Sequence, residues 1–144
     1  MLFRSNRAEV TAEGVEMSLQ VHPWSVLGWT AHLTYVKTDV NGTDEALRNR
    51  PTWRGGFTVR WWPLPELDLH LQTLVVGKVL DSSIPTGART LDAYARVDLA
   101  ATWTITSSWQ AFLAVDNLFD ADYEEFIGFP APRISPRAGV RASF

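Results

Sequence analysis

The 144-residue sequence contains no cysteine, which excludes disulfide bonds and thiolate metal sites. Its formal net charge of −3 is too small to indicate a nucleic-acid partner. No run approaches the roughly 18 continuous apolar residues of a transmembrane helix, and the opening MLFRSNRAEV lacks the apolar core of a secretory signal. What the sequence does contain is aromatic residues: seven Trp, seven Phe and three Tyr, in a chain that is only 20% charged.

Seven segments alternate apolar and polar side chains with a period of two, which is the pattern of a β-strand with two different faces. In GVEMSLQVH, for example, Val15, Met17 and Leu19 are each followed by a polar residue. The segments are about 9–11 residues long, the length that a tilted strand needs to cross a bilayer. They span residues 14–22, 27–37, 53–61, 67–76, 94–103, 109–119 and 137–144.

Short and long connections alternate between these segments. HPWSV, PLPE and TITSS are tight links rich in residues that favour turns. TDVNGTDEALRNRP, GKVLDSSIPTGARTLD and DADYEEFIGFPAP are long. In an up-and-down meander this alternation places every tight turn on one rim and every long loop on the other, as in bacterial outer-membrane barrels. We therefore predict an all-β, antiparallel up-and-down meander of about seven strands that forms the C-terminal portion of a transmembrane β-barrel.

Tryptophan placement supports a membrane interface at the tight-turn rim. A ring with one polar edge is stable at the level of lipid headgroups, so a girdle of such rings marks the interface. Tryptophans that filled a soluble core would favour strand centres instead. The predicted aromatic girdle consists of Trp24, Trp61, Trp62, Trp103 and Trp109.

The last strand keeps its alternation up to Phe144. Lipid offers no partners for backbone amides, so a strand that ends in this way must be paired within a closed sheet. The tail is also similar to the C-terminal targeting signal of outer-membrane proteins, with Arg137, Gly139, Ala142 and Phe144 in the signal positions. That resemblance implies that the barrel-assembly machinery binds the C-terminal strand.

The last thirty residues, VDNLFDADYEEFIGFPAPRISPRAGVRASF, resemble the C-terminal end of TonB-dependent outer-membrane receptors. Upstream, Gly14, Val15 and Glu16 are similar to a Gly-Val-Glu strand of the same family, and the resemblance covers essentially the whole chain. The positions that carry the terminal motif are Asn117, Leu118, Phe119, Asp120, Tyr123, Gly128, Phe129, Pro130, Arg133 and Phe144.

This resemblance implies a 22-stranded barrel with a plugged lumen in the outer membrane of a Gram-negative bacterium. It also implies that the partner TonB is contacted through an N-terminal plug, and that the ligand is a cobalamin or a ferric siderophore, with cobalamin favoured. The sequence shows no plug and only about seven strands. An odd number of crossings conflicts with the even number of single-chain bacterial barrels. We therefore expect residues 1–144 to be the C-terminal portion of a longer receptor, with the plug and upstream strands absent, and not competent for transport alone.

The polar face contains few candidates for chemistry. His22, His32 and His70 lack ligand spacing, so we expect lumen-facing side chains and no metal site. The acidic residues near position 120 lack the glycine and glutamate of a calcium loop and are interpreted as the rim of the last loop. No nucleophile motif or phosphate-binding loop is present, so we expect no cofactor and no enzymatic activity. The lumen-lining arginines Arg54, Arg60, Arg96, Arg137 and Arg141 are expected to pair with carboxylates such as Glu16, Asp68 and Asp98.

Two alternatives remain open at the level of sequence. One is a smaller outer-membrane barrel with catalytic groups at its external rim, which requires a catalytic constellation. The other is a soluble β-domain that binds a partner through its edge or face.

Overall fold

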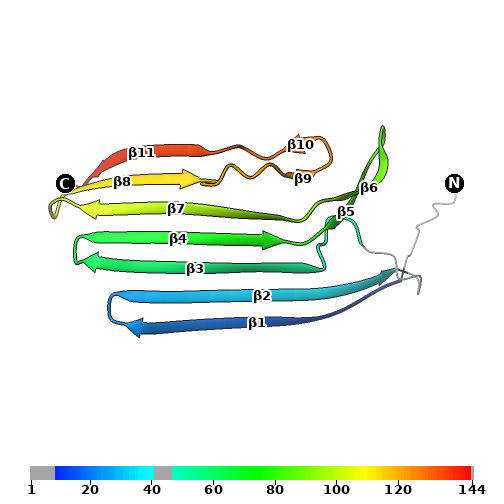
Figure 1. Cartoon of the computed structure of the whole chain (residues 1–144), viewed down its shortest axis with the longest axis horizontal. Helices are drawn as coiled ribbons and strands as arrows, with labels where there is room; N and C mark the ends of the chain where they lie inside the picture. Colours follow the sequence, from blue (N-terminus) through cyan, green and yellow to red (C-terminus); the bar gives the residue numbers. More distant parts are fainter. Residues whose placement is uncertain (1–8, 41–46, 144) are drawn as a thin grey trace, which may run out of the picture.

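The computed structural model describes residues 9–40 and 47–143. Its main sheet is antiparallel and has the strand order β1-β2-β3-β4-β7-β8-β11, so neighbouring strands also follow one another along the chain (Figure 1). This arrangement confirms the predicted all-β meander of seven strands. The seven strands are β1 (Val10–Trp24), β2 (Leu27–Val40), β3 (Trp53–Leu64), β4 (Leu67–Val76), β7 (Tyr94–Thr104), β8 (Trp109–Asp116) and β11 (Ser135–Ala142).

The strand ends differ from the sequence pattern where local backbone geometry intervenes. β4 has the predicted bounds, whereas β1 and β2 extend further toward the long-loop end. β8 stops at Asp116, three residues before its predicted end, because Asn117 adopts a left-handed conformation with φ of 53°. A left-handed residue turns the chain out of the sheet.

Strand register places most of the apolar side chains of the seven strands on one face. Because successive side chains point to opposite faces, the next row along each strand is polar. One continuous apolar row consists of Val21, Trp29, Val59, Leu71, Leu99, Val115 and Pro136. The neighbouring polar row consists of Gln20, Thr30, Thr58, Gln72 and Asp98.

The apolar face is not covered by other described residues. Met17 is 65% exposed and Leu19 is 62% exposed, although both lie within the long strand β1. Large side chains in the core of a globular protein are normally far more buried. A single sheet with one uncovered apolar face needs another apolar phase against that face. Within the described ranges there is no helix long and apolar enough to cross a membrane.

The buried side chains gather at the long-loop end instead. In the described part of the chain, three of the five buried hydrophobic residues, Leu91, Tyr123 and Ile127, lie outside the main sheet, and the other two are Val76 of β4 and Ala114 of β8. Asp81 and Asn117 are buried with them. The loops thus provide a small globular core, while the sheet itself is a single layer.

Two of the long connections contain strands that the sequence analysis treated as loop. β5 (Val79–Ser83) and β6 (Gly87–Leu91) form a hairpin, and β9 (Glu124–Phe126) pairs with β10 (Phe129–Pro130). The hairpin closes through the three residues 84–86 and a glycine, Gly87, with φ of 69°. A short loop followed by a left-handed glycine is a common hairpin connection, so SIPTG was a usable signal.

The tight turns are joined to one another across the opposite end. The amide of Trp62 donates to the carbonyl of Val26 (2.8 Å), and the amide of Thr104 donates to the carbonyl of Glu66 (2.8 Å). The amide of Ser143 donates to the carbonyl of Ser108 (2.9 Å). These bonds continue the ladder up to the turns, so few backbone groups are left unpaired at this rim.

Gly139 is required by a close cross-strand contact. It pairs with Phe112 of β8, and a Cβ atom at Gly139 would lie 2.7 Å from the Phe112 ring. The ring therefore covers the glycine and occupies the space that a side chain would need, an arrangement that also stabilises glycines in designed sheets.

We expect Gly139→Ala to destabilise the sheet by about 1–3 kcal/mol, because the added methyl group forces the Phe112 ring to move. In a Phe112→Ala background the same change should cost less than half as much, since the obstructing ring is gone. Denaturant unfolding from detergent micelles measures all four free energies of unfolding. An equal cost of Gly139→Ala in both backgrounds would contradict the proposed contact.

Candidate functional site

The three long connections meet at one end of the sheet and contact one another (Figure 1). From the first connection, the amide of Asn49 donates to the carbonyl of Leu80 (2.8 Å). From the last connection, the amide of Ile127 donates to the Asp81 carboxylate (2.9 Å). The β5–β6 hairpin therefore lies between the other two connections and touches both.

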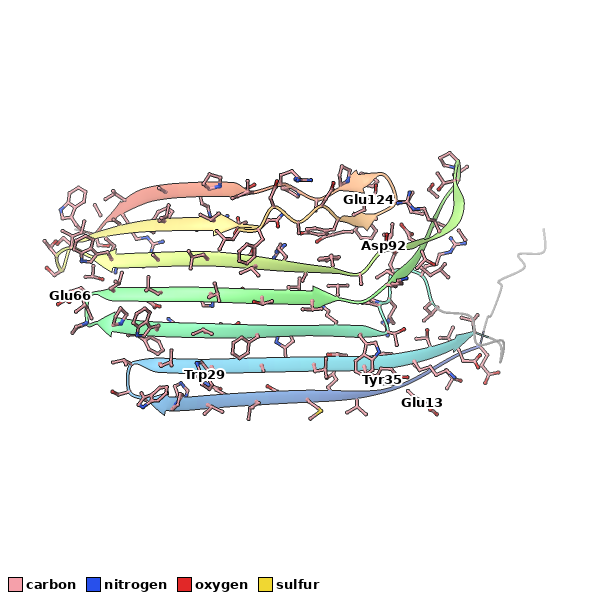
Figure 2. All side chains as sticks on the ribbon, viewed as in Figure 1. Glu13, Trp29, Tyr35, Glu66, Asp92 and Glu124 are labelled. Atoms are coloured by element: carbon pink, nitrogen blue, oxygen red, sulfur yellow. The ribbon has the colours of Figure 1, made fainter. Side chains whose placement is uncertain are left out.

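A hollow of about 200 Å³ lies beneath these loops on the polar face of the sheet. Its floor includes Arg54 and Tyr94, and Figure 2 shows two acidic residues, Asp92 and Glu124, at the same end. The lining mixes carboxylates, a guanidinium group, aromatic rings and aliphatic side chains, which suits an amphipathic small molecule. The full lining consists of Asn49, Pro51, Arg54, Leu74, Val76, Val79, Leu91, Asp92, Tyr94, Glu124, Glu125 and Phe126.

Asn117, the first residue of the predicted C-terminal motif, anchors the start of the last loop. It is 2% exposed, and its side-chain amide donates to the carbonyls of Ala121 (2.9 Å) and Pro132 (3.1 Å). Its side-chain oxygen accepts from the amide of Ala121 (2.8 Å), and its own amide donates to Asp98 on β7 (2.9 Å). One buried side chain thus joins the beginning and the end of the loop.

Asp120 and Arg133 close the same loop by a bidentate ion pair. Nε and one terminal nitrogen of Arg133 donate to the two Asp120 oxygens at 2.8 Å and 2.7 Å, and the amide of Ile134 donates to Asp120 at 3.1 Å. The Arg133 hydrogen bonds, followed by the Ile134 amide, lower the pKa of Asp120 from 3.8 to about 2. Arg133 also pairs with Asp122 (3.0 Å). This geometry accounts for the acidic residues that were interpreted as the rim of the last loop.

Tyr123 connects the last loop to the polar face of the sheet. Its ring stacks on Tyr94 with centroids 3.9 Å apart and an interplanar angle of 16°. Arg96 donates to the Tyr123 hydroxyl (3.3 Å), and Arg96 also pairs with Asp98 (3.0 Å). The stacked rings and the guanidinium group hold the loop against β7.

The remaining motif residues have separate positions. The amide of Leu118 donates to the carbonyl of Val97 (2.7 Å), which extends the β7–β8 pairing by one bond. Phe119 is exposed. Gly128 has φ of 81° between β9 and β10, where a residue with a side chain would be strained. Pro130 lies in β10 opposite Glu124.

The residues of the predicted targeting signal lie on β11, except for Phe144, which lies outside the described residues. Arg137 forms a bidentate pair with Asp116 (2.7 and 3.1 Å), Gly139 is covered by Phe112, and Ala142 pairs with Trp109. These contacts give each residue a role within the sheet. Recognition of the tail as a targeting signal stays a prediction.

Four tryptophans of the predicted girdle share the apolar face near the tight turns. Trp24, Trp61, Trp103 and Trp109 are 45–62% exposed. A register shift in β1 sets Trp24 opposite Leu27, which brings this even-numbered residue onto the apolar face. The fifth, Trp62, lies with Arg60 instead, and the Arg60 guanidinium carbon is 5.0 Å from the centre of its ring. That these rings contact lipid headgroups stays a prediction.

A second aromatic pair marks the other end of the apolar face. Tyr35 and Trp53 face each other across β2 and β3 with ring centroids 4.4 Å apart. Figure 2 shows Trp29 and Tyr35 toward opposite ends of β2. Trp53 and Trp61 are eight residues apart on β3, which corresponds to about 26 Å at 3.3 Å per residue. At the roughly 35–45° tilt of strands in outer-membrane barrels this length corresponds to about 19–22 Å along the membrane normal, which is most of their roughly 25 Å apolar band.

Three of the five arginines that were expected to line the lumen lie on the polar face and pair with carboxylates. Arg60 pairs with Asp68 (2.6 Å), Arg96 with Asp98 (3.0 Å) and Arg137 with Asp116 (2.7 Å). Among the residues that the structure describes, no group of three His, Asp or Glu side chains is arranged to hold a metal ion.

Comparison with known proteins gives one consistent result. The family model for TonB dependent receptor-like β-barrels matches residues 2–118. The chain is 27% identical over 124 residues to the ferrienterobactin receptor of Escherichia coli strain K12, a match that covers 80% of this chain and 17% of that protein. It is 29% identical over 102 residues to the vitamin B12 transporter BtuB of Vibrio cholerae serotype O1, covering 67% of this chain and 17% of that protein.

A solved structure shows the same fold. The ferripyoverdine receptor of the outer membrane of Pseudomonas aeruginosa superposes with a TM-score of 0.79 at 19% identity, over 95% of this chain and 20% of that one. The chain therefore spans about a fifth or less of the length of the proteins named here.

The chain belongs to the TonB-dependent receptor β-barrel family. This is a family of outer-membrane receptors of Gram-negative bacteria and not of enzymes, which confirms the expected family, location and absence of enzymatic activity. Four residues of the motif that suggested the family, Asn117, Asp120, Tyr123 and Arg133, anchor the last loop. The sequence analysis missed Asp81, Tyr94 and Glu124, because their partners are distant in sequence and no local pattern indicates them.

We expect Asn117→Ala to destabilise the last loop by about 2–4 kcal/mol, because it leaves three backbone groups without their partner. Amide hydrogen exchange at Ala121 measures the loss directly. The exposed Asp122, changed to Asn, is the control and should leave this exchange rate nearly unchanged. Equal exchange in the Asn117→Ala variant and the wild type would show that Asn117 does not anchor the loop.

The ion pair between Asp120 and Arg133 should stay intact down to a lower pH than the ordinary pKa of an aspartate would allow. Since the pKa of Asp120 is lowered from 3.8 to about 2 in the folded loop, its contribution to stability is complete above about pH 4 and is lost as the pH falls toward 2. A nitroxide at exposed Phe129 should therefore become mobile only between about pH 4 and pH 2. Asp120→Asn is the control and should already be mobile at pH 7. A mobility midpoint above pH 4 that Asp120→Asn abolishes would refute this assignment.

Proposed function

We propose that residues 1–144 form the C-terminal portion of a longer TonB-dependent receptor, and that this receptor takes up a cobalamin or a ferric-siderophore type ligand. The observation that carries the proposal is the continuous two-faced sheet, which matches solved receptors over nearly the whole chain but over only a fifth of their length. The names of the relatives, a ferrienterobactin receptor and a vitamin B12 transporter, suggest the two ligand classes.

The apolar face contacts lipid in this proposal. Its side chains are exposed along the strands, and aromatic residues lie at both of its ends. Acyl chains provide the apolar phase that the single-layer sheet lacks within the chain. The tight turns then lie on the periplasmic side and the long loops on the external side.

The polar face forms part of the inner wall of the barrel. The hollow beneath the long loops opens on this wall at the external end, which is where a ligand arriving from outside would first meet it. Phe126 and the neighbouring acidic side chains Glu124 and Glu125 contribute aromatic and hydrogen-bonding groups for a ligand.

The two edges of the sheet are where further strands and the barrel-assembly machinery bind in this proposal. β1 and β11 are the edge strands of the described sheet, and each offers a row of backbone groups to a further strand. We infer that upstream strands of the same receptor pair there. The barrel-assembly machinery binds the C-terminal strand during insertion, and TonB acts through a plug that these residues do not contain. The chain alone is not competent for transport.

Ligand binding tests this proposal in the receptor that carries the chain, inserted in outer-membrane vesicles. Either vitamin B12 or ferrienterobactin should bind with a Kd of about 1 μM or tighter. Phe126→Ala should weaken that binding about tenfold, because it removes the aromatic wall of the hollow. Phe119→Ala is the matched control, since Phe119 is exposed and is not part of the hollow.

A nitroxide at Leu69 that is accessible to oxygen, together with one at Gln72 that is accessible to a water-soluble quencher, verifies correct insertion. If neither ligand binds to a receptor that passes this check, the assignment of the ligand class is wrong. If the labels at Leu69 and Gln72 show the reverse accessibility, the assignment of the two faces is wrong.

A further inference from the structure

Asp81 is a buried carboxylate in the middle of the three long connections. Its side chain is on β5, and the residue is 7% exposed. One oxygen accepts from the amide of Ser82 (2.7 Å), and the other accepts from the amide of Ile127 (2.9 Å), which is 46 residues away and itself buried. A carboxylate that is buried in a loop needs such partners, because burial without them is costly.

The first long connection contacts the same point. The amide of Asn49 donates to the carbonyl of Leu80, next to Asp81. The hydrogen bond from Ile127 is the main cause that lowers the pKa of Asp81, and the charge of Arg48 and the side chain of Asn49 act in the same direction. Groups from both outer connections therefore stabilise the ionised form of one side chain on the central hairpin.

A second polar contact between the hairpin and the last loop is an exposed ion pair, which is a weaker kind of contact than the buried hydrogen bond from Ile127 to Asp81. Arg89 pairs with Glu124 at 3.0 Å, but its side chain is 56% exposed. Exposed ion pairs contribute little to stability, whereas a buried carboxylate that accepts from backbone amides fixes the position of those amides. Leu91 and Ile127 are buried close by and exclude water from this region.

We propose that Asp81 is a positioning residue that joins the three long connections into one unit at the rim of the hollow. Through Asp81 and Leu80, the hairpin fixes Asn49 and Pro51 on one side of the hollow, and Glu124 and Phe126 on the other. A displacement of one outer connection is therefore transmitted to the other through the hairpin. That the hollow is the entrance for a ligand rests on the proposed function. The coupling of the loops does not, because it can be measured without ligand.

Distances between spin labels test this coupling in the full receptor. The chain has no cysteine of its own, so labels are placed at exposed Arg50 and Phe129, in the two connections that do not contain Asp81. Asp81→Asn should widen the distance distribution between these labels about twofold, because the central link is weakened. The control is Asp92→Asn, in the same connection, which changes an exposed carboxylate that also lines the hollow. It should leave the distribution unchanged.

An unchanged distribution in Asp81→Asn would overturn the proposal, and so would equal widening in Asp92→Asn. If Asp81→Asn does not assemble, hydrogen exchange in the wild-type receptor gives the decision. The amides of Asn49 and Ile127 should then exchange with the same protection, since one opening event exposes both. Protection factors that differ by more than about tenfold would show that the outer connections open independently. Neither result depends on whether vitamin B12 or ferrienterobactin binds.

Discussion

Every backbone amide and carbonyl that lies in lipid must find its partner within the protein, because acyl chains offer none. In the described sheet every strand between the two edges pairs with both of its neighbours, so only the outer sides of β1 and β11 are left to pair with further strands. The same constraint fixes the register. A slip of β3 by one residue would move Val59 to the polar face and bring Thr58 to the apolar face. The pairing of the backbone groups and the separation of apolar from polar side chains therefore select the same strand register, and the sheet needs no second layer.

At the long-loop end of the sheet the stabilisation is of a different kind. The long connections bury side chains against one another, so the small core of Leu91, Tyr123 and Ile127 forms there. Buried polar groups at this end, Asp81 and Asn117, find their partners among backbone amides and carbonyls of other loops. The molecule thus combines a single-layer sheet that has an uncovered apolar face with a rim that has a small globular core.

These two kinds of stabilisation explain what the sequence could predict. The period of two follows from the different character of the two faces, and it identified β4 to the residue and the faces of six of the seven strands, since the alternation in β8 is less regular. The end of β8 was not predicted, because the left-handed conformation of Asn117 depends on partners as far away as Pro132. The contact between Asp81 and Ile127 joins residues 46 apart, and no local pattern specifies such a pair. Trp62 was grouped with its neighbours by position alone, whereas strand geometry places it beside Arg60.

The residues that suggested the family have a structural task rather than a ligand-binding one. Asn117 is 2% exposed, so it has almost no surface to offer a ligand, and Asp120 is engaged by both Arg133 and the amide of Ile134. Asp98 links this anchor to the inner wall, because it accepts from the amide of Asn117 and pairs with Arg96. The motif therefore fixes the last loop on a rigid wall. In the proposed function, discrimination between ligands comes from accessible side chains at the hollow, which include Asp92, Glu125 and Phe126.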